Sequence, residues 1–347
     1  MRTVTKTIVA KFRQAGLVVA LGALALIAAC AGEGEVGSNA WSIVVLPDTQ
    51  DYTESFEDPF ESQIDWILDN IDALDIRFVL HEGDIVEFNE VEQWRVAQRQ
   101  LGRLSGRVPL ALSIGNHDMG IEEWADVRSS KIDDYFAWEE LADKSNRGGR
   151  YDDTIWNSYY YFAGDVTEWL ILSLEFGPRS NVLQWADDVI ANHPEHDVIV
   201  LTHAYLYSDG TRYDWGRKGE SQRWNPHSYD LQPPEAASES RSVNDGEQMW
   251  NQLVSRHPNI RFVLSGHTLN DGVGRLTSTG DAGNEVHQLM ANYQHQVVHN
   301  GQSRADSGFL RVMEFNEEGG AVQVRTYSPW LDQSLDDPDN LFTLSLK

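Results

Sequence analysis

The sequence predicts an α/β fold arranged as a four-layer α/β/β/α sandwich. Over most of the chain, short apolar runs of strand length alternate with segments whose apolar residues repeat at the spacing of one helix face. From residue 286 onward, strand-like runs follow one another with no helical segment between them. Helix-linked strands form sheets that helices cover, and a tail of strands alone extends a sheet, so stacked layers are expected.

The expected elements follow in chain order. Strands are expected at short apolar runs: Trp41–Pro47, Arg77–His81, Val108–Ile114, Trp169–Leu174, Val198–Thr202, Ile260–Ser265, Val286–Tyr293, Phe309–Phe315, Ala321–Tyr327 and Leu341–Leu346. Helices are expected at Phe60–Leu74, Val91–Leu104, Val182–Asn192 and Val243–His257. Two aperiodic stretches, near 119–157 and 205–242, are expected to be functional loops inserted into one domain spanning 41–347.

The composition excludes several classes of protein. The 347 residues are 41% hydrophobic and 10% aromatic, which excludes a wholly disordered chain. They include 54 acidic and 27 basic side chains, so the formal charge is −27. This chain lacks the Lys and Arg excess that bulk binding of nucleic acid or of anionic lipid requires. One cysteine excludes an intramolecular disulfide, a zinc site made of four cysteines and an iron–sulfur cluster held by this chain alone.

The first thirty residues predict export rather than part of the fold. Four basic residues and no acidic residue precede an apolar run at Ala15–Ala29. Ile27-Ala28-Ala29-Cys30 resembles the bacterial lipobox, in which the cysteine is lipidated and becomes the first residue. We therefore expect a lipoprotein signal peptide at 1–30, a flexible tether at 31–40, and an exported protein anchored at the outer membrane or cell surface through a lipidated Cys30. A plain secretory signal or a short membrane anchor are the alternatives.

Five polar clusters each follow an expected strand. They are Asp48-Thr49-Gln50, Gly83-Asp84, Gly115-Asn116-His117-Asp118, Thr202-His203 and Gly266-His267. Because ligands of α/β sheets bind at the carboxyl ends of strands, we expect the five clusters to meet at one rim. Carboxylates, imidazoles and an amide together suit manganese, iron or zinc. The sequence therefore predicts a metal site with mixed oxygen and nitrogen ligands.

The order of these clusters resembles the calcineurin-like metallophosphoesterase family, whose pattern runs D-x-H, GD, GNH[ED], a lone His and GHxH. The resemblance covers about Trp41–Tyr327. It implies hydrolysis of a phosphate mono- or diester by a metal-activated water. By position, it implies metal ligands at Asp48, Gln50, Asp84, Asn116, His203 and His267. It also implies that His117 acts as an acid or charge stabiliser and that Asp118 orients its ring.

Further motifs resemble an exported bacterial lipoprotein branch of this family. They are the Pro-Asp-Thr-Gln of the first cluster, Asn292-Tyr293-Gln294 and Tyr327-Ser328-Pro329. The chain also departs from the family pattern, because Gln50 and Leu269 stand where the pattern has histidines. An oxygen-rich first metal position favours manganese or iron, with zinc possible, and one or two divalent ions are expected. Asn270, Asp271 or His295 could replace the ligand missing at Leu269.

The expected partner is a small phosphoester. The 205–242 insertion offers basic and aromatic side chains that could grip a phosphate, or that could instead pair with acids and pack over the sheet: Arg212, Arg217, Lys218, Arg223, Tyr213, Trp215 and Trp224. The second functional hypothesis is a surface-anchored binding protein whose degenerate first metal position no longer supports turnover. The sequence does not indicate an oligomeric state.

Overall fold

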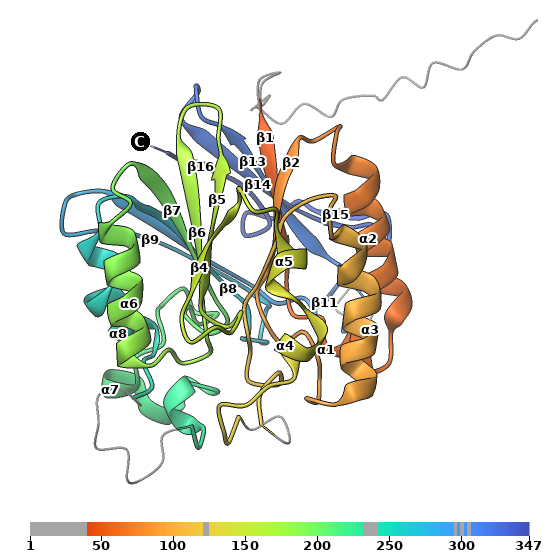
Figure 1. Cartoon of the computed structure of the whole chain (residues 1–347), viewed down its shortest axis with the longest axis horizontal. Helices are drawn as coiled ribbons and strands as arrows, with labels where there is room; N and C mark the ends of the chain where they lie inside the picture. Colours follow the sequence, from red (N-terminus) through yellow and green to blue (C-terminus); the bar gives the residue numbers. More distant parts are fainter. Residues whose placement is uncertain are drawn as a thin grey trace, which may run out of the picture. The chain divides into compact units, whose positions relative to one another are not determined.

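The computed structural model describes residues 40–120, 125–231, 242–294, 297–298, 302–303 and 307–346 (Figure 1). All of them belong to one compact unit, Val36–Lys347. The expected signal peptide at 1–30 and nearly all of the expected tether lie outside the described residues, as do His295 and parts of both expected insertions. Among the described residues, no helix combines the length and apolar character needed to cross a membrane.

The first sheet joins the N-terminal strands to the tail of the chain. Three parallel strands, β1 (Trp41–Leu46), β2 (Ile76–His81) and β3 (Leu110–Leu112), continue from β1 into antiparallel β13 (Leu310–Asn316) and β14 (Ala321–Ser328). Both β15 (Gln333–Leu335) and β16 (Leu341–Ser345) pair with β14. The expected tail of successive strands is therefore confirmed. From Leu310 onward it extends this sheet through β1, whereas its first expected strand, Val286–Tyr293, belongs to the second sheet.

The second sheet has the strand order β4-β5-β6-β7-β8-β10-β9. Its centre is parallel and is made of β6 (Glu168–Leu174), β7 (His196–Thr202), β8 (Ile260–Ser265) and β10 (Glu285–Ala291). Antiparallel β4 (Arg147–Arg150), β5 (Ser158–Ala163) and β9 (Val273–Thr279) lie toward its edges. The sequence did not predict β9, whose outer half alternates exposed and partly buried residues. A two-stranded hairpin pairs β11 (Val297–Val298) with β12 (Gln302–Ser303).

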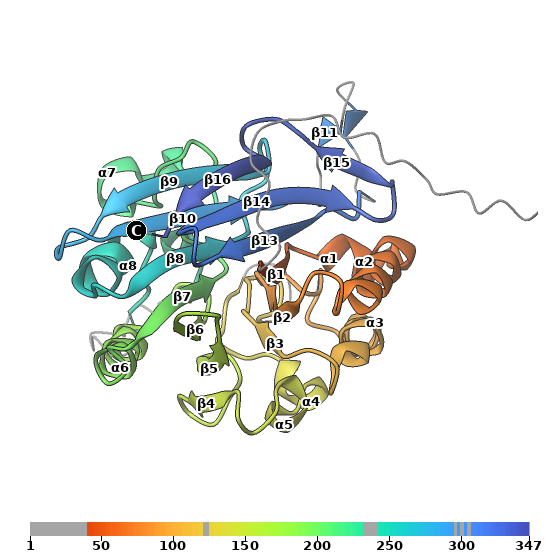
Figure 2. The same ribbon diagram turned by 90° about the horizontal axis from the view of Figure 1, so that it is seen from above.

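Helices cover the outer face of each sheet (Figures 1 and 2). Helices α2 (Glu57–Asn70) and α3 (Val91–Leu101) lie beside the first sheet, and α6 (Ser180–Ala191) and α8 (Gly246–Gln252) lie beside the second. The short helices are α1 (Gln50–Glu54), α4 (Ile132–Tyr135), α5 (Trp138–Leu141) and α7 (Trp215–Lys218). Helix α8 is shorter than expected because the Asp245 capping box sets its start and a 3-10 turn at Val254–Arg256 ends the segment.

The alternation of side chains along β7 creates two cores. Val198 and Val200 pack with the helices α6 and α8, whereas Ile199 and Leu201 face the space between the sheets. In that inner core, Trp41 stacks on Phe315 with ring centroids 4.1 Å apart and meets Trp169 of the second sheet edge-on at 5.9 Å. The expected α/β fold is confirmed, and the structure shows that both of its sheets are mixed.

Candidate metal centre

The polar clusters meet across the two sheets. Asp48 follows β1 and Asp84 follows β2, whereas His203 and His267 follow β7 and β8 of the second sheet. The Asp84 Oδ2 atom lies 2.9 Å from His203 Nε2. The backbone N–H of His267 donates to Asp48, with 3.1 Å between N and Oδ2. The carboxyl ends of these strands therefore bring together residues that lie far apart along the chain.

Three buried acceptor groups converge at the centre of the site. The ligand atoms of Asp84, His203 and His267 all lie within 4.8 Å of one another, and His203 Nε2 is 3.0 Å from His267 Nδ1. The other nitrogen of each ring faces a backbone carbonyl. His203 Nδ1 is 2.9 Å from the oxygen of Glu82, and His267 Nε2 is 2.8 Å from that of Trp224.

These carbonyl contacts determine which ring nitrogens can bind a cation. A carbonyl only accepts hydrogen bonds, so His203 Nδ1 and His267 Nε2 carry the protons. The lone pairs of His203 Nε2 and His267 Nδ1 then face each other and the Asp84 carboxylate. Three acceptors at this distance repel one another unless a cation lies between them, so the donor set fits a divalent metal ion.

The electrostatics of the centre also favour positive charge. Burial alone would lower the pKa of His203, but the negative charges of Asp84 and Asp48 raise it to about 9. Burial and the neighbouring His203 lower the pKa of His267 to about 3. Burial would raise the pKa of Asp84, but the surrounding histidines hold it below its usual range. One positive charge is thus stabilised here. Without a metal ion this charge is a second proton, on His203 Nε2, and a bound divalent cation would displace that proton and supply the charge instead.

The backbone at the centre is strained. Asp84 and His267 have φ values of 47° and 74°, and Trp224, whose carbonyl faces His267, has a φ of 61°. Residues other than glycine rarely adopt this left-handed region, and such outliers gather at functional sites. A Cβ on Gly115 would lie 2.1 Å from Asp84 Oδ1, and one on Gly266 would lie 2.1 Å from Asp48 Oδ1. Both motifs need glycine so that the carboxylates can approach the backbone.

Asp48 and Gln50 occupy the other side of the centre. Burial raises the pKa of Asp48 to about 8, and its Oδ2 accepts a hydrogen bond of 2.7 Å from Asn292 Nδ2. Gln50 Nε2 donates to Glu87 Oε2 over 2.7 Å, which directs the amide oxygen away from that carboxylate. This oxygen, Gln50 Oε1, is buried and has no hydrogen-bond partner among the described residues. An unpaired buried acceptor of this kind fits a ligand to a cation.

The structure corrects the expected role of Asp118. Its Oδ1 accepts the backbone N–H groups of Ile85 and Val86 at 2.9 and 3.0 Å, and its Oδ2 accepts that of Gly115 at 2.8 Å. The carboxylate therefore fastens the two motif loops together and does not serve to orient the His117 ring. Burial and the nearby Asp84 raise the pKa of Asp118 to about 7.

Glu87 takes the place beside the His117 ring. His117 Nδ1 lies 2.9 Å from the Glu87 backbone oxygen and 3.5 Å from Oε2 of its side chain. The backbone N–H of His117 also donates to Asp84 Oδ1 over 3.0 Å. Sequence reasoning missed Glu87; the available signal was a carboxylate three residues after Asp84, close enough in a tight loop to return to the same rim.

A cavity of about 280 Å³ opens onto this centre. Its walls include residues from the centre and from the 205–231 segment: Gln50, Asp51, Asp84, Glu87, Asn116, His117, Trp224, Tyr229, His267, Leu269 and Gln294. Leu269, which replaces the second histidine of the family pattern, is thus part of the wall. Asn270, one of its possible substitutes, donates instead to Ser208 Oγ over 2.7 Å.

The basic side chains of the inserted segment mostly pair with acids. Arg212 Nε lies 2.6 Å from Glu247 Oε2, and Lys218 Nζ lies 3.1 Å from Asp209 Oδ2. Arg223 stacks on the ring of Trp224, with its Cζ atom 4.5 Å from the ring centroid. None of the basic residues that the structure describes in this segment lines the cavity at the centre. Of the two interpretations of this insertion, the structure therefore favours acid pairing over a phosphate grip.

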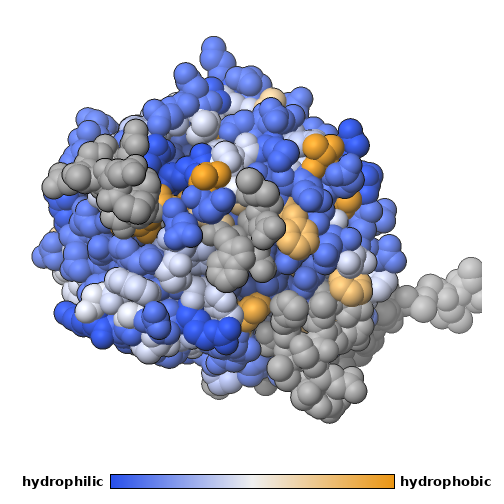
Figure 3. All heavy atoms as spheres, turned by 90° about the horizontal axis from the view of Figure 1, so that it is seen from below, coloured by the Kyte–Doolittle hydropathy of each residue, from blue (hydrophilic) through white to orange (hydrophobic). Residues whose placement is uncertain are grey.

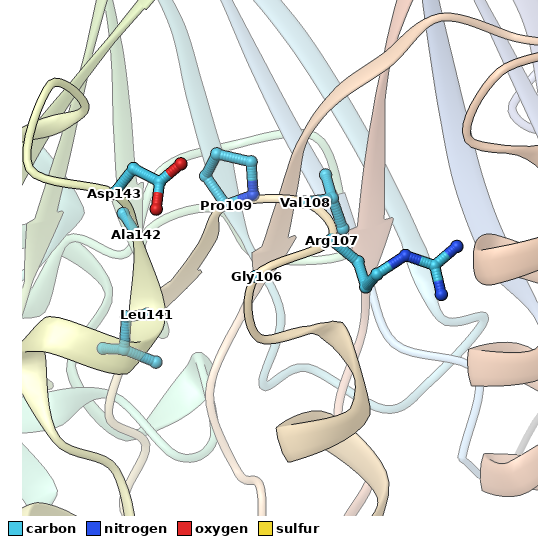
Figure 4. Close-up of a pocket in the computed structure, with 7 residues that line it drawn as sticks. All are labelled: Gly106, Arg107, Val108, Pro109, Leu141, Ala142 and Asp143. Carbon is cyan, nitrogen blue, oxygen red and sulfur yellow. The ribbon is translucent and has the colours of Figure 1, made fainter.

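Other surface features lie outside the centre. A hollow of about 60 Å³ beside the start of β3 has a wall running from Gly106 to Pro109 and from Leu141 to Asp143, and in Figure 4 Arg107 points away from Asp143. It contains none of the predicted site residues. Figure 3 views the end of the molecule where α4 and α7 lie, and its described atoms are mostly hydrophilic, with apolar residues scattered singly.

Comparison with known proteins gives the family. The sequence pattern described as calcineurin-like phosphoesterase matches residues 42–271, a span that contains all five polar clusters. This chain belongs to the calcineurin-like phosphoesterase family. The family is one of hydrolases, and the buried group of Asp84, His203 and His267 in this chain could hold a metal ion.

One relative and two solved structures resemble this chain. The uncharacterised protein YvnB of Bacillus subtilis (strain 168) is 28% identical over 318 residues, which are 88% of this chain and 22% of YvnB. This chain thus spans about a fifth of the length of that relative. Purple acid phosphatase PPD1 from yellow lupin seeds superposes with a TM-score of 0.51 at 12% identity, over 89% of this chain and 54% of the lupin protein, and so shares the fold. GAP50 of Plasmodium gives 0.46 at 11% identity, over 89% of each chain.

Proposed function

We propose that this phosphoesterase hydrolyses a small phosphate mono- or diester with the help of divalent metal ions. The observation that carries the proposal is the convergence of Asp84 Oδ2, His203 Nε2 and His267 Nδ1, three acceptors whose ring protons are committed to backbone carbonyls elsewhere. Asp48, Gln50, Asp84, Asn116, His203 and His267 would hold the ions. When bound, such ions supply positive charge to the phosphoryl oxygens and make water acidic enough to attack near neutral pH.

The charge of the cavity supports a need for these ions. Its wall contains the carboxylates of Asp51, Asp84 and Glu87, and none of the lysines and arginines that the structure describes. An anionic phosphoester would be repelled by these carboxylates alone. Metal ions at the centre would reverse the local charge, so substrate binding and metal binding are expected to depend on each other.

His117 would serve the leaving group. The backbone oxygen of Glu87 accepts from Nδ1, so the ring's other nitrogen, Nε2, is the one that would act toward the cavity that His117 lines. The Glu87 carboxylate 3.5 Å away stabilises positive charge on the ring. A protonated His117 can give its proton to the departing oxygen or bind a phosphoryl oxygen, and general acid help of this kind contributes roughly 10²–10⁴-fold.

The size and walls of the cavity favour a small substrate. Its volume of about 280 Å³ is at the lower end of small-molecule sites, which span about 300–1,000 Å³. Trp224 and Tyr229 add aromatic surface beside the centre, onto which an organic group of the ester could pack. A polyanion such as a nucleic acid strand would be repelled by a protein whose formal charge is −27.

The proposal is tested with purified protein that begins after Cys30. Nitrophenyl phosphate and bis-nitrophenyl phosphate are assayed with manganese, iron and zinc. We expect turnover with at least one metal and its loss in Asp84→Asn and His203→Ala. His196→Ala is the matched control, because His196 lies at the opposite end of the strand that leads to His203, and this variant should keep full activity. A wild-type protein that is folded but inactive with every metal and ester would contradict the proposal.

The second candidate is a binding protein without turnover. Leu269 in the cavity wall favours it, because a leucine cannot replace a metal-binding histidine. Tight binding of a phosphoester or of metal by a protein that never hydrolyses any ester would support this candidate over the first.

We propose further that the chain is exported and held at the cell envelope by a lipidated Cys30, as a member of a lipoprotein branch of the family. The lipobox-like Ile27-Ala28-Ala29-Cys30 and the basic and apolar residues before it support this. Cys30→Ser should move the full-length protein from the membrane fraction to the soluble exported fraction. Unchanged fractionation of this variant would count against lipidation.

A further inference from the structure

Gln294, the last residue of the Asn292-Tyr293-Gln294 motif, is a buried polar residue in the cavity wall to which no role has yet been assigned. Its side chain is 4% exposed, and its Oε1 is buried without a hydrogen-bond partner among the described residues. Gln50 shares all of these properties: it is 4% exposed, lines the same cavity, and has a buried Oε1 without a described partner. Two amide oxygens in one polar cavity therefore lack donors, which is unfavourable unless a cation or water meets them.

A rigid connection links the Gln294 backbone to Asp48. Asn292 follows β10 and bridges the two residues, because its Nδ2 donates to Asp48 Oδ2 over 2.7 Å and its Oδ1 accepts the backbone N–H of Gln294 over 3.1 Å. The intervening Tyr293 is buried, and its hydroxyl lies 2.6 Å from Asn340 Oδ1 and 3.0 Å from Thr326 Oγ1. The backbone of Gln294 is thus linked to the Asp48 carboxylate through the Asn292 side chain, while its own side chain lines the cavity.

The histidine side of the centre differs in chemistry. His203 and His267 contribute two nitrogens, whereas Asp48, Gln50 and Gln294 offer oxygens. His117 Nε2 lies 3.4 Å from Gln50 Nε2, on the nitrogen side of that amide rather than beside its oxygen. Leu269 offers no ligand atom there, and Asn270 is directed to Ser208. Gln294 supplies a further oxygen in the cavity wall. This oxygen is buried and has no described hydrogen-bond partner, so a bound cation would satisfy it.

We propose that Gln294 is a metal ligand, which together with Asp48, Gln50 and Asp84 forms an all-oxygen site next to the histidine site. The inference rests on the proposed use of two divalent ions by this phosphoesterase. Oxygen-only sites prefer manganese, magnesium or calcium, whereas sites with two imidazoles also bind zinc tightly. The two positions should therefore differ in metal preference and in affinity.

The test measures metal binding directly, independent of turnover. Metal-free protein is titrated with Mn²⁺ by calorimetry, and bound metal is counted by elemental analysis after dialysis. The wild type should show a tight and a weak site. Gln294→Leu should weaken the weak site at least about 10-fold and leave the tight site unchanged, given that even indirect partners of metal ligands change affinity by about 10–100-fold. Gln294→Glu should strengthen the weak site, because it exchanges a neutral oxygen for a charged one.

Gln63→Leu is the matched control. Gln63 is fully buried and also has an unpartnered Oε1 among the described residues, but its Nε2 donates to the Phe309 carbonyl and it does not line the cavity. This variant should bind both ions as the wild type does. Equal Mn²⁺ binding by wild type and both Gln294 variants would overturn the proposal, as would a wild type with a single site.

These outcomes are separate from those that test hydrolysis. If the protein binds two ions in a Gln294-dependent manner but hydrolyses no ester, the inference about Gln294 is supported and the proposed function is wrong. If the wild type hydrolyses esters but the Gln294→Leu variant binds both ions normally, the proposed function is supported and the inference about Gln294 is wrong.

Discussion

The turn before Asn116 offers a sharp test of how closely the site depends on backbone packing. In Gly115→Ala, the new Cβ would lie 2.1 Å from Asp84 Oδ1 and 2.4 Å from the Asp84 backbone nitrogen, whereas ordinary contacts begin at 3.4 Å. The Asp84 loop must therefore move by about 1 Å. A misplacement of about 1 Å at a reacting centre can lower the rate about 10²-fold, which corresponds to about 2.7 kcal/mol of transition-state stabilisation.

The expected result is a loss of function that exceeds the loss of stability. Gly115→Ala should lower kcat/KM for bis-nitrophenyl phosphate about 100-fold and reduce the bound metal per chain, because Asp84 belongs to the metal-binding group. Overpacking of this size should lower the free energy of unfolding by about 1–3 kcal/mol, measured by chemical denaturation.

Gly102→Ala is the control for this substitution. Gly102 has a φ of −60°, and a Cβ there would meet nothing within 4 Å, so the variant should keep its activity and be as stable as the wild type or slightly more stable. If Gly115→Ala kept wild-type kcat/KM and metal content, the argument that this turn needs glycine to accommodate Asp84 would be wrong.

Four further predictions concern stability, pH and the site. Burial would raise the pKa of Glu175, but pairing with Arg128 and Arg179 holds this pKa below the ordinary 4.5. The Glu175 carboxylate therefore stabilises the folded state fully at pH values above 4.5. This stabilisation is lost as the pH falls through the lowered pKa of the folded state. Glu175→Gln should lower the free energy of unfolding by about 3–5 kcal/mol at pH 7 and make this free energy fall less steeply as the pH is lowered; an unchanged dependence at acid pH would contradict this. Trp41→Ala should lower the free energy of unfolding by about 3–5 kcal/mol, measured by urea denaturation, because the fully buried Trp41 ring packs between the two sheets; a decrease of less than about 1 kcal/mol would refute that role. Glu87→Gln should lower kcat and alter its pH profile with little change in KM, since it removes the negative charge beside the His117 ring, which is proposed to act on the leaving group; an identical profile would remove Glu87 from the proposed mechanism. Removal of metal with a chelator should lower the melting temperature, and added Mn²⁺ should restore it in proportion to the logarithm of its concentration; a melting temperature insensitive to both would mean that no ion is bound.

Part of the site could be predicted from the sequence because its residues follow strands directly. Asp84 and His203 each come within three residues of a buried apolar strand, and parallel strands end at one edge of a sheet. The local pattern of apolar runs thus contained the information that these side chains would meet. The same holds for the strand-only tail, whose alternating burial along β14 is a property of neighbouring residues.

Other contacts depend on where loops fold back, which local patterns do not encode. The Glu87 side chain reaches the His117 ring, and Asp118 turns away from it toward backbone N–H groups, although Asp118 is its sequence neighbour. The carbonyl of Trp224 faces His267 only because a long inserted segment returns to the rim.

The amino-acid sequence by itself determined the alternation of strands and helices, the acidic charge and the residue types available for binding metal, because these follow from composition and from spacing along the chain. The tertiary structure decided which ring nitrogens face the centre, that Glu87 lies beside His117, and that Asn292 links the Gln294 backbone to Asp48. The physical reason is that hydrogen-bond direction and burial depend on groups brought together from distant parts of the chain, and their partners exist only once both sheets have packed.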